Sequence, residues 1–125
     1  MSLPIIVHLD IPPIADDSAH RADQIAEVLG TVSSVLVIMG DDRDLVLDGT
    51  EDKTCKDFTL ACQAQGISCA IVQAGVSPNL AKALAGNVVP VVCNMLNGYV
   101  KSSMIGASSE VQIQAFIVAG VTPVL

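Results

Sequence analysis

Aromatic side chains are nearly absent from this sequence. Its 125 residues contain no Trp, one Tyr and two Phe, although 51% of the residues are hydrophobic. The core must therefore be built from Val, Ile, Leu and Ala, which suits a buried parallel sheet covered by helices. The length predicts a single domain over residues 1–125, with a core large enough to need no disulfide framework.

Basic residues are also scarce, with six Lys and Arg against 13 Asp and Glu, for a net charge of −7. Nucleic acids and anionic membranes are bound by clustered Lys and Arg, so we expect neither as a partner. No apolar run approaches the ~18 residues of a spanning helix, and no basic stretch leads into one at the N-terminus. We therefore expect a soluble, cytoplasmic protein whose four cysteines are free thiols.

Motifs for metals and nucleotides are missing. Cys62 and Cys69 are seven residues apart, and no cysteine or histidine pair shows the short spacing of a zinc site. The acidic segment 41–52 offers a calcium loop, but Val46 and Cys55 stand where that loop needs carboxylates. The glycines are isolated, without the spacing of a phosphate-binding loop. We expect no metal and no cofactor.

Charge is distributed unevenly along the chain. Segment 41–57 holds seven acids and three bases, whereas the 68 residues of 58–125 hold three charges. Two predicted helices of that second half have small or neutral outward residues, namely Asn79, Lys82, Ala83 and Asn87 on one, and Gln112, Gln114, Ala115 and Val118 on the other. Interface cores are depleted of charge in this way. The pattern predicts an apolar surface that binds a protein partner or forms a homo-oligomer.

The apolar pattern predicts five strands and four helices. The strands are expected at Pro4–Leu9, Val35–Met39, Ile67–Val72, Val88–Leu96 and Tyr99–Ile105. The helices are expected to run from Asp16-Asp17 to Gly30, from Thr50 to Gly66, from Ser77-Pro78 to Gly86, and from Ser108 to a stop at Gly120 and Pro123. Asn97-Gly98 predicts an antiparallel hairpin between the last two strands. The fold class is therefore α/β, βαβαβαββα, with a mixed sheet and helices on both faces.

The segment 77–116 resembles thioredoxin. It contains, in order, a helix start at Ser77-Pro78, Val89-Pro90, the strand Val91–Leu96, Asn97-Gly98, the strand Tyr99–Ile105, Gly106-Ala107 and the helix Ser108–Phe116. Thioredoxins show these features at similar spacings. The resemblance implies a thioredoxin-like fold in which the Val89–Pro90 peptide bond is cis.

The redox half of the thioredoxin pattern is absent. Thioredoxins follow their second strand with Trp-Cys-Gly-Pro-Cys, whose thiols carry out disulfide exchange. Counted from the second predicted strand, the two cysteines and the residues between them fall on Asp44, Leu45, Val46 and Leu47. The family's buried Asp falls on Ile38 and its neighbouring Lys on Ile71. The resemblance therefore identifies an atypical, redox-inactive member.

A second alignment sets the segment 52–56 against Cys-Gly-Pro-Cys-Lys and leaves Cys55 as one thiol near a helix start. That arrangement favours a single-thiol oxidoreductase, because a helix N-terminus lowers a thiol pKa. Glu51 and Asp52 would oppose this effect, whereas Lys53 and Lys56 would favour it. The alternative requires a long insertion before the helix.

The leading interpretation is a protein that works by binding, as a chaperone, assembly factor or scaffold. The resemblance implies a groove where an extended partner segment pairs with the backbone at Val89 and Pro90, a form of strand addition that needs no thiol. Asp44–Leu47 would lie across this groove. The alternatives are the oxidoreductase using Cys55 and a structural domain that forms oligomers.

Overall fold

The computed structural model describes residues 5–12, 18–30, 32–39, 53–86, 91–96, 99–105 and 110–121. The strands in these ranges are β1 (Ile5–Ile6), β2 (Ser34–Ile38), β3 (Cys69–Gln73), β4 (Val91–Leu96) and β5 (Tyr99–Ile105). The helices are α1 (Ser18–Leu29), α2 (Lys53–Gln65), α3 (Pro78–Ala85) and α4 (Glu110–Val121). The element order is the predicted βαβαβαββα.

The strands form one mixed sheet in the order β1-β3-β2-β4-β5. Both β1 and β2 run parallel to β3, while β4 runs antiparallel to β2 and to β5. Helices connect the parallel strands because a parallel pair needs a crossover. The predicted antiparallel pairing of the last two strands is confirmed.

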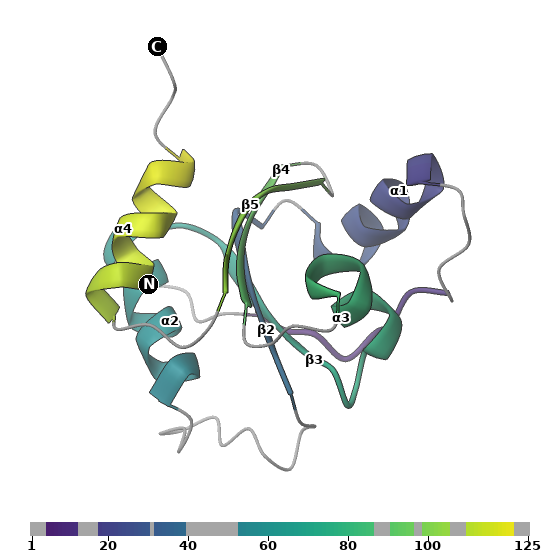
Figure 1. The fold of residues 1–125 in the computed structure, drawn as a ribbon, viewed down its shortest axis with the longest axis horizontal. Coiled ribbons are helices and arrows are strands. Elements are labelled where there is room, and N and C mark those ends of the chain that lie inside the picture. The colour runs from purple at the N-terminus through teal and green to yellow at the C-terminus, as the bar shows by residue number, and fades with distance from the viewer. Residues whose placement is uncertain are drawn as a thin grey trace.

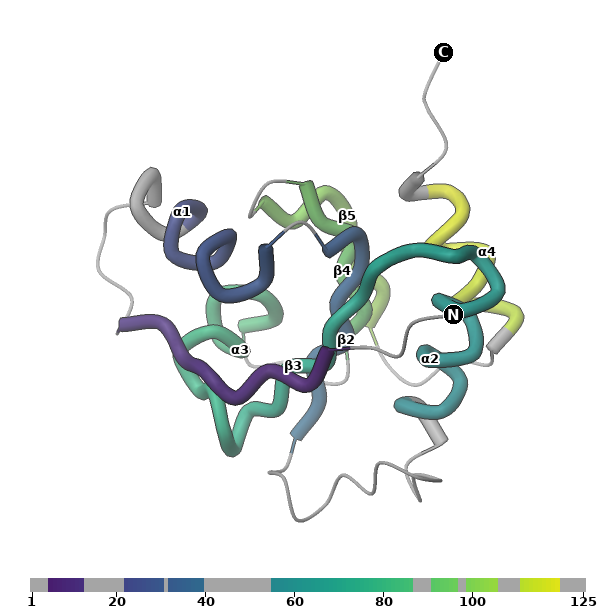
Figure 2. The backbone as a smooth tube through the Cα atoms, turned by 180° about the vertical axis from the view of Figure 1, so that it is seen from behind, coloured from purple at the N-terminus to yellow at the C-terminus, as the bar shows by residue number. Residues whose placement is uncertain are grey.

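Helices cover both faces of the sheet (Figure 1). One layer holds α1 and α3, and the other holds α2 and α4, as the view from behind also shows (Figure 2). Strand β2 divides its side chains between the two layers, so Val35 and Val37 pack with α1 and α3 while Leu36 and Ile38 pack with α2 and α4. This double burial explains the uninterrupted apolar sequence of β2.

Several predicted boundaries differ from the structure. The first strand was expected over Pro4–Leu9, but only Ile5 and Ile6 form β1, and Asp10 further on is bonded to α3. The third strand begins at Cys69 and not at Ile67, because the Ile67 amide is bonded to the end of α2. The last helix was expected to be stopped by Gly120 and Pro123, and α4 ends between these two residues, at Val121. Glycine weakens a helix by about 1 kcal/mol relative to alanine, which does not force a helix to end.

The other predicted helix ends are correct. Gly30, Gly66 and Gly86 each have a positive φ, between 64° and 67°, directly after α1, α2 and α3. After α2 the amide of Gly66 donates to the carbonyl of Gln63, and that of Ile67 donates to the carbonyl of Cys62. Glycine adopts this left-handed conformation without the penalty of a Cβ atom. None of the helices in the described ranges combines the length and apolar character needed to cross a membrane.

Candidate functional site

The carboxyl ends of the parallel strands meet at one edge of the sheet. Ile38 at the end of β2 is the register partner of Gln73 at the end of β3. Strand β4 enters at the same edge, because Val91 pairs with Val37. Met39, directly after β2, is exposed to 68% and lies at the rim. Ligands of open α/β sheets commonly bind at this edge.

The residues of the groove predicted from sequence are outside the described ranges. These residues are Val89, Pro90, Asp44, Leu45, Val46 and Leu47. The peptide bond before Pro90, which was predicted to be cis, is outside them as well. Both the groove and the cis bond therefore remain predictions.

Two apolar side chains occupy positions where thioredoxins bury charge. Ile38 and Ile71 are exposed to only 6% and 3%, and both belong to the core cluster that packs against α2 and α4. Ile71 pairs in register with Leu36, two residues before Ile38. Neither Ile38 nor Ile71 carries a carboxylate that could accept a proton.

All four cysteines are buried free thiols. Their exposed fractions are 0% for Cys55, 1% for Cys62, 4% for Cys69 and 0% for Cys93. Cys55 does lie in the first turn of α2, as the single-thiol alternative requires, but its side chain packs in the core. Reactive thiols sit in partly exposed surroundings, so this burial does not favour Cys55 as a nucleophile.

Cys93 lies on the α3 side of β4. Its thiol donates to the carbonyl of Leu84 at 3.7 Å and lies 3.9 Å from the hydroxyl of Ser103. Burial raises the pKa of Cys93, and the contact with Ser103 lowers it to a smaller extent. The thiol is therefore kept protonated.

The N-terminus of α3 lies at the same edge and is closed by Asp10. The Asp10 carboxylate accepts hydrogen bonds from the backbone amides of Asn79 at 3.2 Å and Leu80 at 2.8 Å, and from the Asn79 side chain at 3.0 Å. Ser77, predicted to be the cap, makes no side-chain capping bond. Its hydroxyl donates instead to the carbonyl of Leu9 at 2.7 Å. The Asp10 carboxylate thus occupies the position at the start of α3 where an external anion could otherwise bind.

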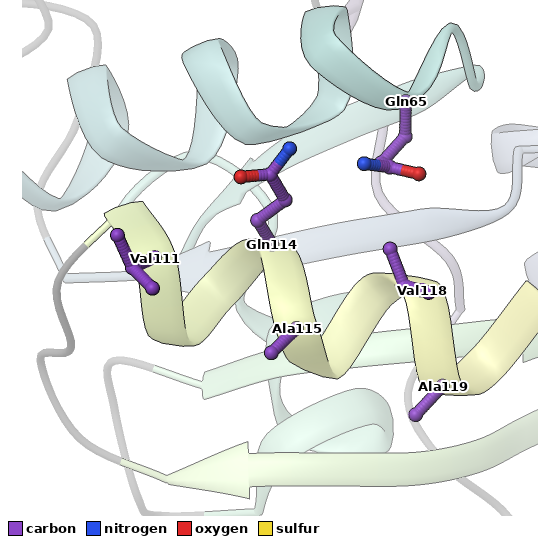
Figure 3. Close-up of a pocket in the computed structure, with 6 residues that line it drawn as sticks. All are labelled: Gln65, Val111, Gln114, Ala115, Val118 and Ala119. Atoms are coloured by element: carbon purple, nitrogen blue, oxygen red, sulfur yellow. The ribbon is translucent and has the colours of Figure 1, made fainter.

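The outer side of α4 is uncharged over residues 111–119. Val111 is exposed to 74% and Val118 to 37%, and Gln112, Ala115 and Ala119 are also exposed. Together with Gln114 and with Gln65 of α2, this side of α4 borders a shallow open hollow of about 530 Å³. We call these exposed residues the α4 face. Figure 3 shows the Gln65 and Gln114 amides between the two helices, with Ala115 and Ala119 on the opposite side of α4.

The sequence predicted which residues of α3 and α4 point outward, and the structure confirms this prediction only in part. On α4 most of them belong to the exposed face, but the prediction missed Val111. On α3, Lys82 is exposed, whereas Asn79 and Ala83 are half-buried, because Asn79 bonds to Asp10 and Ala83 packs on the core. Asn87 lies outside the described residues.

The role of Asp10 was also missed. Its hydrogen bonds reach a helix 70 positions further along the chain, and no local pattern links residues at that separation. An acid one or two residues after a short apolar run is an ordinary loop residue by sequence alone.

The described side chains offer no metal centre. Within the described ranges, no three His, Cys, Asp or Glu side chains come close enough to hold a metal ion.

No protein-family model matches the chain, and no curated protein sequence matches it either. Solved structures do match. A mutant thioredoxin from Halobacterium salinarum NRC-1 superposes with a TM-score of 0.61 at 14% identity, over 98% of this chain and 95% of that one. A chain from a study of thiol resolution in yeast mitochondrial 1-Cys peroxiredoxin via glutathione/thioredoxin systems gives a TM-score of 0.54 at 14% identity, over 90% and 98%. With the observed strand order, these similarities show that the chain has the thioredoxin-like fold.

Proposed function

We propose that this protein acts by binding another protein through the α4 face, and not by thiol–disulfide exchange. The observation that carries the proposal is the absence of any charged side chain from residues 111–119 of a solvent-facing helix. A surface helix normally presents charged and polar residues to water. The occupant we propose is a partner with an apolar, uncharged patch.

The composition of the α4 face supports this choice of partner. Val111, Ala115, Val118 and Ala119 offer no cation for phosphate and no carboxylate for a basic ligand. Small side chains let a second backbone approach closely. Exposed apolar patches of this kind mark protein interfaces, and the glutamines at its border supply hydrogen bonds of the type found at an interface rim.

The burial of the four thiols supports the second part of the proposal, that the protein does not act by thiol–disulfide exchange. A thiolate must reach the sulfur of a partner disulfide, and the most exposed of these thiols, that of Cys69, is exposed to only 4%. The single-thiol oxidoreductase using Cys55 is therefore not favoured. Free thiols would suit the cytoplasm, which is the location we propose.

The groove beside Val89 and Pro90 is a second proposed contact, on the basis of the resemblance alone. An extended partner segment would pair there with the backbone, with Asp44–Leu47 across from it. Exposed Met39 would lie at the rim of the groove. A role as chaperone, assembly factor or scaffold would use either surface.

The test compares immobilised wild type with three variants in a pull-down from native lysate, followed by affinity measurement on each captured protein. Val111→Glu/Ala115→Glu makes the charge of the α4 face more negative by two. Lys82→Glu changes the charge by the same amount at an exposed position of α3, on the other side of the sheet, and is the matched control. Met39→Glu tests the rim of the groove.

The expected result is a partner whose affinity falls at least about tenfold with the α4 double variant and is unchanged in the Lys82 control. A partner that loses binding only with Met39→Glu would reject the α4 face and favour the groove. Sedimentation equilibrium distinguishes self-association, since a monomer has a mass of 12.9 kDa. A concentration-dependent dimer sensitive to the same double variant would show that a second copy is the occupant.

A further inference from the structure

Two of the buried thiols lie against each other. Cys62 is in the last turn of α2 and Cys69 is the first residue of β3. Their side chains are hydrogen-bonded to each other, and both belong to the core cluster between the sheet and the α2–α4 layer. Neither residue takes part in the function proposed above.

The turn between α2 and β3 brings these two positions together. The carbonyl of Cys62 accepts a hydrogen bond from the amide of Ile67 at 3.3 Å, so the chain folds back directly at the helix end. Cys69 follows two residues later, after exposed Ser68. A disulfide requires Cα atoms within about 7 Å, a condition that such a tight connection favours.

The two thiols are not equivalent. The contact with Cys62 lowers the pKa of Cys69, whereas the contact with Cys69, together with burial, raises the pKa of Cys62. Cys69 is also the more accessible, at 4% exposed against 1%. Since the thiolate is the nucleophile, Cys69 is the thiol that reacts first with an oxidant.

We propose that Cys62 and Cys69 are a modification site that forms an intramolecular disulfide when the chain meets a low-molecular-weight disulfide such as glutathione disulfide. Cys69 is the attacking thiol and Cys62 the resolving thiol. The other cysteines are not part of the site, because Cys93 lies in the opposite core cluster, against Leu84 and Ser103. Cys55 is about two helical turns from Cys62.

The chemistry balances with one molecule of oxidant. The Cys69 thiolate attacks a sulfur of glutathione disulfide, the bond between its two sulfurs breaks, and one glutathione leaves as a thiolate that takes up a proton. The Cys62 thiol then loses its proton to solvent and attacks the Cys69 sulfur, which releases the second glutathione. Two protein thiols are oxidised and one glutathione disulfide is reduced to two thiols. Access of the oxidant requires local opening of the turn after α2.

The experiment uses the full chain, reduced and then incubated with glutathione disulfide at pH 8. The thiols that remain are blocked with N-ethylmaleimide in denaturant. The protein is then digested with trypsin, and the peptide masses are measured by mass spectrometry. The peptide Asp57–Lys82 contains Cys62 and Cys69 and no other cysteine. We expect it to lack both maleimide groups and to be lighter than its reduced form by two hydrogen atoms. The peptides with Cys55 and Cys93 should be fully blocked and serve as internal controls.

Two variants test the order of attack. Cys62→Ser should accumulate a glutathione adduct on Cys69, whereas Cys69→Ser should carry none on Cys62. An adduct on Cys62 would overturn the assignment of the attacking thiol. If wild type keeps both thiols, or carries glutathione on both without an internal disulfide, the site does not exist. Circular dichroism shows whether each serine variant folds. If one does not, the wild-type experiment by itself decides whether the disulfide forms.

Discussion

Asp10 and Leu80, 70 positions apart, are joined by a 2.8 Å hydrogen bond from the Leu80 amide to the Asp10 carboxylate. The same carboxylate also accepts from the backbone and side chain of Asn79. The segment after β1 therefore supplies the cap of α3, which fixes the helix start against the edge of the sheet. Charge-assisted bonds to amides at a helix start are favourable because the helix dipole adds to each of them.

Replacing Asp10 with Ala should lower the free energy of unfolding by about 1–3 kcal/mol, because the first amides of α3 lose their acceptor. Asp10→Asn should cost less, since its amide oxygen still accepts one bond. Asp23→Ala removes an exposed carboxylate of α1 and should stay within about 0.5 kcal/mol. Urea unfolding measures all three, and equal losses for Asp10→Ala and Asp23→Ala would disprove the capping role.

A buried polar network joins both halves of the sheet to α4. The Ser34 hydroxyl donates to Asn94 Oδ1 at 2.8 Å, and Asn94 Nδ2 donates to the Ser102 hydroxyl and to the Phe116 carbonyl, both at 3.1 Å. Ser34 and Asn94 are exposed to 0% and 2%. Asn94→Leu should destabilise the fold by about 1–3 kcal/mol, because the buried Ser34 hydroxyl loses its acceptor.

A double variant distinguishes lost hydrogen bonds from a misfitting side chain. In Ser34→Ala/Asn94→Leu the serine hydroxyl is removed together with its acceptor, so part of the cost should be recovered relative to the sum of the single variants. The measurement is again urea unfolding. Strict additivity of the two losses would show that the network is not coupled.

Burial of Cys93 predicts a dependence of stability on alkaline pH. Its pKa is raised in the folded chain, so the folded state holds the proton more tightly than the unfolded state, in which the thiol pKa is about 8.5. The stabilisation from the protonated thiol is therefore fully present below a pH of about 8.5. It is lost as the pH rises toward the folded pKa, and the free energy of unfolding falls by up to about 1.4 kcal/mol per pH unit. The stability difference between wild type and Cys93→Ala should therefore shrink between pH 8 and 10. A stability difference that stays constant over this pH range would contradict the prediction.

Lys101 should protect the exposed edge of the sheet. Strand β5 is an edge strand, and the shift in its pairing with β4 leaves Lys101 as the extra residue between Val100 and Ser102. Bulges and lysines on edge strands discourage pairing with other chains. Lys101→Val should increase light scattering of concentrated protein over time, whereas Lys82→Val makes the same change on a helix and should not. Equal scattering from both variants would point to lost charge alone.

The protein should not catalyse dithiol exchange. In an insulin reduction assay with a thiol reductant, wild type and Cys55→Ser should both match the rate without protein, because every thiol is buried and none forms a Cys-x-x-Cys pair. Thioredoxin is the positive control. Turnover that depends on Cys55 would restore the oxidoreductase alternative. The disulfide proposed for Cys62 and Cys69 consumes one oxidant per chain and does not predict turnover.

Local sequence patterns were enough to predict the element order and most of the core. Apolar runs such as β2 are long enough to identify buried strands, and Gly30, Gly66 and Gly86 mark helix ends through a backbone conformation that glycine adopts most easily. The absence of a Cys-x-x-Cys pair is likewise a property of the sequence. These features depend on residues close together in the chain, which is why local patterns reveal them.

Contacts between residues far apart in the chain could not be predicted from these local patterns. The cap of α3 comes from Asp10 and not from adjacent Ser77, and Asn94 collects partners from β2, β5 and α4. The contact between Cys62 and Cys69 depends on how the turn after α2 returns to the sheet. Hydrogen bonds and thiol contacts act over a few ångströms, and sequence spacing sets no such distance until packing against the sheet has fixed the direction of each side chain.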